Sequence, residues 1–150
     1  METTAVPRVI DQLVFLLRAR PNLADAQVLD GPELSGNYKD LVILVGYNPD
    51  AQVDVTVTRT TRGLVPNVEE EFELGVLINA IDGTGNVKAA RDKAKAALDE
   101  LAAVITTRDM TLGGTCGHIQ LGTAMTWRTF PTPKGVESTL ACSITGKALL

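Results

Sequence analysis

Three groups of residues in this 150-residue sequence have types and spacings that are used in chemistry. Gly83 and Gly85 follow a strand-like stretch, Cys116 and His118 stand two residues apart, and glutamates crowd residues 69–73. In other settings such groups bind dinucleotides, act as nucleophile and base, or hydrolyse glycosidic bonds. Each of them also has a purely structural explanation.

The glycine pair is similar to the turn that binds dinucleotide phosphates at the start of a helix. The third glycine of that fingerprint would fall at Lys88, and no acidic residue for the ribose stands at the right distance downstream. An ordinary strand-to-helix turn is the better explanation. Binding of a small molecule at the Gly83–Gly85 turn stays open as an alternative function.

Cys116 and His118, the sole histidine, lack the third group that a catalytic or metal site needs. Nothing nearby supplies an orienting acid or an oxyanion hole, and two soft ligands do not complete a tetrahedral metal site. Cys142 lies too far along the predicted hairpin for a disulfide with Cys116. We therefore expect core cysteines, a surface histidine, no metal, no cofactor and no enzymatic activity.

The glutamates at positions 69, 70, 71 and 73 form the densest charge cluster of the sequence. Consecutive carboxylates beside a loop have neither the shared pocket nor the opposed environments that catalytic pairs need. A solvated loop edge is the simplest explanation. The sharper alternative is an acidic surface that faces a polyanion without binding it.

The composition excludes several functional classes. A net charge of −4 argues against general binding of nucleic acid or anionic membranes, which needs clustered Lys and Arg. The longest apolar run, Leu41–Val45, is too short to span a bilayer. The first eight residues lack the features of a signal peptide, so we expect synthesis in the cytoplasm. Aromatic residues, at 4%, are too few for base-stacking platforms.

Two segments have the period of amphipathic helices. The first has Thr4 as its expected N-cap and ends at Pro21, and the second runs from about Val87 to Ile105 after an Asn86 N-cap. Their apolar residues recur at helical spacing: Val6, Val9, Ile10, Leu13, Val14, Leu16 and Leu17, then Val87, Ala90, Ala94, Ala97, Leu98, Leu101 and Ile105. The alanine-rich second stripe indicates close packing on a sheet or another helix.

Between and after these helices the apolar residues follow the period of strands. Residues 41–45 form a continuous apolar run, whereas residues 53–58 and 72–80 alternate. Residues 119–127 and 136–144 alternate as well, which predicts a closing hairpin. The sequence therefore predicts one α+β domain, residues 1–150, with a mostly antiparallel sheet of about four to five strands packed by two amphipathic helices.

The closing hairpin has its expected turn at Phe130–Gly135. That turn pairs Leu121 with Ile144, Thr123 with Cys142, and Met125 with Leu140. This register places both apolar sets on the same side of the sheet.

A polar stretch between the alternating strands is typical of a loop. It runs from Arg59 to Asn67 and contains Gly63 and Pro66. We predict that Arg59, Arg62 and Leu64 form an assembly-contact loop, mobile in the free subunit and ordered by a neighbour.

Taken in order, four segments resemble the tail terminator proteins of long-tailed bacteriophages, also described as tail completion or neck proteins. They are residues 10–19 (IDQLVFLLRA), 69–83 (EEEFELGVLINAIDG), 86–105 (NVKAARDKAKAALDELAAVI) and 109–114 (DMTLGG), followed by the closing hairpin. The resemblance lies in the order and size of these segments and covers nearly the whole chain.

The resemblance implies a structural protein of the virion neck. Members of this family form rings, usually of six subunits, that cap the head-proximal end of the tail tube, stop its elongation and join the tail to the head. The implied partners are further copies of the chain, the tail tube protein and a head-proximal connector, with DNA passing through unbound. Glu69, Glu70 and Glu71 would face that channel. A stopper or head-completion protein and a tube subunit stay open as alternatives.

Overall fold

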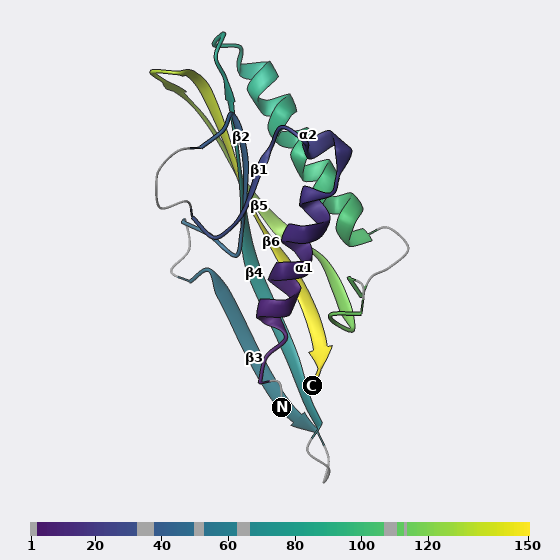
Figure 1. Ribbon diagram of the computed structural model, residues 1–150. Coiled ribbons are helices and arrows are strands. Elements are labelled where there is room, and N and C mark those ends of the chain that lie inside the picture. Colours follow the sequence, from purple (N-terminus) through teal and green to yellow (C-terminus); the bar gives the residue numbers. More distant parts are fainter. Residues whose placement is uncertain (1–2, 33–37, 50–52, 63–66, 107–110, 113) are drawn as a thin grey trace.

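The computed structural model describes residues 3–32, 38–49, 53–62, 67–106, 111–112 and 114–150. It is a single α+β domain in which two helices cover one face of a six-stranded, mostly antiparallel sheet (Figure 1). The fold class and the two helices are confirmed. The sheet has six strands, however, rather than the four to five that the sequence predicts.

The strands are short at one edge of the sheet and long in its middle. Their bounds are β1 Gln27–Asp30, β2 Leu41–Val45, β3 Val55–Arg62, β4 Asn67–Asp82, β5 His118–Thr132 and β6 Gly135–Leu149. The order across the sheet is β1-β2-β4-β6-β5, and β3 also pairs with β4. Among the described strands, only the β1–β2 pair is parallel. The strand that the sequence did not predict is β1, in which one residue, Val28, is buried.

Strands β2 and β3 share one edge of β4, end to end. Gly75 lies at their junction: its N–H donates to the Asp54 carbonyl (2.9 Å), and its carbonyl accepts the N–H groups of Gly46 (2.8 Å) and Tyr47 (3.1 Å). Beyond this point β3 and β4 continue as a hairpin toward the lower end of Figure 1. We call this hairpin, residues 55–62 and 67–74, the arm.

The two helices bury most of the stripes that the sequence predicts. Helix α1, Val6–Arg18, buries its stripe except for Ile10 and Leu16, which are partly buried. In α2, Val87–Thr106, three alanines are buried against the sheet, but Val87 is 43% exposed. Neither helix has the length and hydrophobicity that crossing a bilayer needs, within the ranges that the structure describes.

The predicted N-cap is right for α2 and wrong by one residue for α1. The Asn86 side-chain oxygen accepts the Ala89 N–H at 3.2 Å, as an N-cap does. In α1 the N-cap position is Ala5, and Thr4 Oγ1 accepts only the Val6 N–H, at 3.2 Å.

The predicted loop that starts at Arg59 is wrong. Arg59 and Arg62 lie within β3, directly across from Glu70 and Asn67 of β4. The threonines around Arg59 are β-branched and favour a strand, and their exposure on both faces hides the usual alternation. Because these residues are paired in a sheet, they are not a loop that orders only on assembly. Leu64 lies outside the described residues.

One of the three pairs predicted for the closing hairpin is confirmed, and the pairs of Thr123 with Cys142 and of Met125 with Leu140 are wrong. Leu121 pairs with Ile144 as predicted, but Met125 pairs with Cys142 rather than with Leu140. The strands pair up to Thr132 and Gly135, so the turn is shorter than expected. A β-bulge between Leu121 and Met125 takes up the difference.

Candidate functional site

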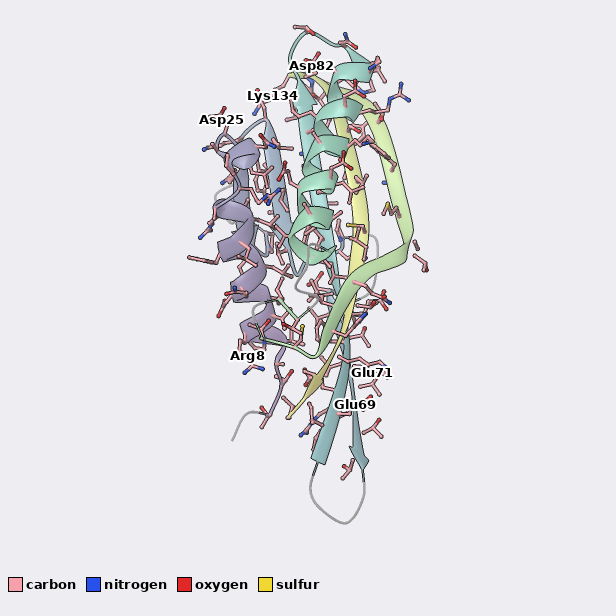
Figure 2. All side chains as sticks on the ribbon, turned by 90° about the vertical axis from the view of Figure 1, so that its right-hand side faces the viewer. Arg8, Asp25, Glu69, Glu71, Asp82 and Lys134 are labelled. Carbon is pink, nitrogen blue, oxygen red and sulfur yellow. The ribbon has the colours of Figure 1, made fainter. Side chains whose placement is uncertain are left out.

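Alternate residues of β4 face opposite sides of the sheet. Glu69, Glu71 and Glu73 lie on the outer face, away from the helices, spaced by roughly 7 Å at strand rise. Glu71 and Glu73 are exposed and Glu69 is partly buried. Figure 2 shows Glu69 and Glu71 on the arm, at the opposite end of the molecule from Lys134. We call these three residues the acidic ladder.

The prediction that Glu70 belongs with them is wrong. Glu70 faces the helices and is fully buried. Its Oε1 accepts the Ala5 N–H at 2.9 Å, at the start of α1, and its Oε2 has no hydrogen-bond partner among the described residues. The alternation that buries Phe72 and Leu74, continued two residues toward the N-terminus, would have placed Glu70 inside.

The strands beside the ladder are mostly uncharged on the same face. On one side Thr60, Thr58 and Thr56 of β3 stand across from the three glutamates. On the other side Lys147 of β6 stands across from Glu71, and its Nζ lies 3.1 Å from Glu71 Oε1. Both side chains of that ion pair are more than half exposed, so it adds little stability. The outer face of the arm therefore stays negatively charged.

A shallow hollow of about 250 Å³ opens beside the ladder. Its walls include Thr56, Glu71, Glu73, His118 and Lys147. His118 comes from β5, where it pairs with Lys147 across the sheet and is half-buried rather than freely exposed. Within the described parts of the chain, no group of His, Cys, Asp and Glu has a geometry that would hold a metal ion.

The predicted contact residues lie apart from the ladder. Arg59 stands across from Glu70, so it belongs to the helix-side face of the arm, where it is exposed. Arg62 is the last residue of β3. The structure thus brings Glu69 and Glu71 together with Glu73, and separates them from Arg59. Glu73 was absent from the predicted channel-facing set, although period-two spacing from Glu69 and Glu71 indicates it.

Both cysteines are free and buried. Burial raises the pKa of the Cys142 thiol to about 11, which suppresses the reactive thiolate at neutral pH. Cys116 Sγ lies 3.5 Å from the Thr111 carbonyl. This arrangement favours a packing role for both thiols.

The Gly83–Gly85 turn is closed by a carboxylate of its own. Asp82 Oδ2 accepts the Thr84 hydroxyl (2.5 Å) and the Asn86 N–H (2.8 Å). These two hydrogen bonds hold the pKa of Asp82 below its usual value, so the carboxylate is ionised at neutral pH. An anion already lies where a ligand phosphate would meet the start of α2, which favours a plain strand-to-helix turn.

Comparisons with known proteins assign no family. A scan against models of protein families finds no match, and a search of curated proteins finds none either.

Proposed function

We propose that this chain is a structural protein of a bacteriophage neck, which forms a ring that caps the head-proximal end of the tail tube, stops its elongation and joins the tail to the head. The observation that carries the proposal is the acidic ladder, three carboxylates in line on an exposed sheet face. The resemblance of the sequence to tail terminator proteins supports the same role.

The ladder suits a surface past which DNA moves. Duplex DNA carries one negative charge per ~1.7 Å of its axis, so a carboxylate-lined wall repels it and forms no lasting phosphate contacts. The threonines of β3 beside the ladder add hydroxyls but no positive charge. Lys147 offsets one of the three glutamates. Such a face lets DNA pass unbound.

The sheet also has the free edges that ring assembly can use. Strand β3 lies at one edge of the arm and β5 at the opposite edge of the sheet. Among the residues that the structure describes, each of these strands presents one row of backbone N–H and C=O groups that pairs with no other strand. A chain with unlike binding surfaces on opposite sides associates head to tail, and such contacts give a ring when the rotation closes.

Reconstruction of the chain bound to purified tail tubes tests the proposal. We expect several copies in a ring at one tube end, with the Glu69–Glu71 end of the acidic ladder facing the lumen. A single bound copy, a non-ring arrangement or a ladder on the outside of the ring would contradict it. Tubes assembled with an excess of the chain should also stop growing at that end, whereas tubes with an unrelated acidic protein should continue to grow.

A further inference from the structure

The hairpin of β5 and β6 ends in a fixed, exposed turn. Thr132 Oγ1 accepts the Lys134 N–H at 3.3 Å and donates to the Gly135 carbonyl at 3.2 Å. Two prolines further restrict the backbone of the turn. Lys134 lies at the opposite end of the molecule from the acidic ladder (Figure 2). A turn restricted in this way loses little conformational entropy when it binds.

The outer face of this turn is aromatic and positively charged. Phe130 is 40% exposed, and Arg128 shares its face of β5. Neither Arg128 nor Lys134 has an ionic partner within the described residues. Glu137, directly across from Phe130, offsets one of the two charges, and the Asp82 carboxylate is held by the turn before α2. One uncompensated positive charge therefore remains beside an exposed ring.

The hollow beside the acidic ladder, at the other end of the molecule, has a charge opposite to that of the turn. Glu71 is compensated there by Lys147, whereas Glu73 has neither an ionic nor a hydrogen-bonding side-chain partner in the described parts of the chain. The remaining walls carry Thr56, Thr58 and His118. The hollow is thus concave, polar and negatively charged, and the turn around Lys134 is convex and positively charged.

We infer that the β5–β6 turn of one copy docks into the hollow of a second copy, with Lys134 opposite Glu73 and Phe130 on the rim. Because the two surfaces lie at opposite ends of the chain, the contact is heterologous and repeats from copy to copy. Closure of these contacts into a ring rests on the proposed function, whereas the contact between two copies does not.

Charge reversal tests this contact on the full-length purified chain. Lys134→Glu and Glu73→Lys should each weaken self-association by about fivefold or more, because one exposed pair contributes up to ~1 kcal/mol and reversal adds repulsion. The double variant should recover most of that loss. Asp11→Lys, which makes the same charge change as Glu73→Lys on the exposed side of α1, outside both surfaces, is the matched control. Sedimentation velocity measures association, and circular dichroism verifies folding.

A chain that stays monomeric at every concentration reached, or single reversals that behave like Asp11→Lys, would overturn the inference. Failure of the double variant to recover association would overturn it as well. A ring on tail tubes that tolerates both single reversals would refute this contact and leave the proposed function standing. Rescued association in a chain that ignores tail tubes would support the contact and refute the function.

Discussion

Glu70 joins the start of α1 to the central strand by a single hydrogen bond. Its Oε1 accepts the Ala5 N–H, one of the N–H groups that the first turn of a helix leaves without a helical partner. A carboxylate at this place is also favoured by the helix dipole. These two interactions offset part of the cost of burying the carboxyl group, which is high for an oxygen without a partner among the described residues, such as Oε2.

Replacing Glu70 therefore separates the hydrogen bond from the charge. Glu70→Leu leaves the buried Ala5 N–H without an acceptor, and we expect a loss of about 1–3 kcal/mol in the free energy of unfolding. Glu70→Gln keeps an acceptor and should lose less. Glu71→Gln, on the exposed face, should stay within about 0.5 kcal/mol of the unchanged chain. Urea unfolding measures all three, and a fully stable Glu70→Leu variant would show that the contact is dispensable.

Because of Cys142, we expect the free energy of unfolding to depend on pH in the alkaline range. Burial raises its pKa from 9.0 to about 11, so between these values the unfolded chain has lost a thiol proton that the folded chain keeps. Stability is then fully present below pH 9 and falls by up to about 1.4 kcal/mol per pH unit above it. Urea unfolding from pH 8 to 10.5 should show this slope, and Cys142→Ala should lack it. Equal slopes in both proteins would contradict the assignment.

At the scale of elements, Gly75 permits β2 and β3 to share one edge of β4. A Cβ atom there would lie 2.6 Å from Asn48 Cβ and 2.9 Å from the Tyr47 carbonyl oxygen. We expect Gly75→Ala to cost about 1–3 kcal/mol, because the backbone itself must move. Gly83→Ala is the control, since the nearest atom to its Cβ is 3.7 Å away. Thermal unfolding of the two variants should differ clearly, and equal melting temperatures would refute the crowding.

The elements that the sequence predicts well are those that bury at least one face. Helices α1 and α2 and strands β4 and β6 each carry an apolar stripe that matches their period, and β2 is a continuous apolar run buried on both faces. Strand β3 buries neither face and β1 buries one side chain, so neither produces such a pattern. The register shift in β5 also has no signal in the sequence, because it depends on how tightly the distant turn closes.

The candidate site, like the fold, was predicted only in part. Charge density alone identified Glu69 and Glu71 but grouped them with Glu70, because neighbours in sequence were treated as neighbours on a surface. The strand period decides which of these glutamates share a face. It removes Glu70 from the outer-face set and adds Glu73. The hollow beside the ladder is lined by Thr56 from β3 and His118 from β5. These two residues are far apart in the sequence, so no local pattern predicts that they line one site.

At the scale of the whole molecule, the ladder concentrates negative charge at one end, and its role in a DNA conduit is testable apart from assembly. Particles that carry Glu69→Lys should still join head to tail, because Glu69 lies outside the hollow that the inferred contact uses. Their DNA should leave more slowly at low salt, since a lysine now faces the phosphates, and added salt should restore the rate by screening. Asp11→Lys makes the same charge change on the exposed side of α1 and should leave the release rate unaltered. Equal, salt-independent release from both kinds of particle would mean that the ladder does not line the channel.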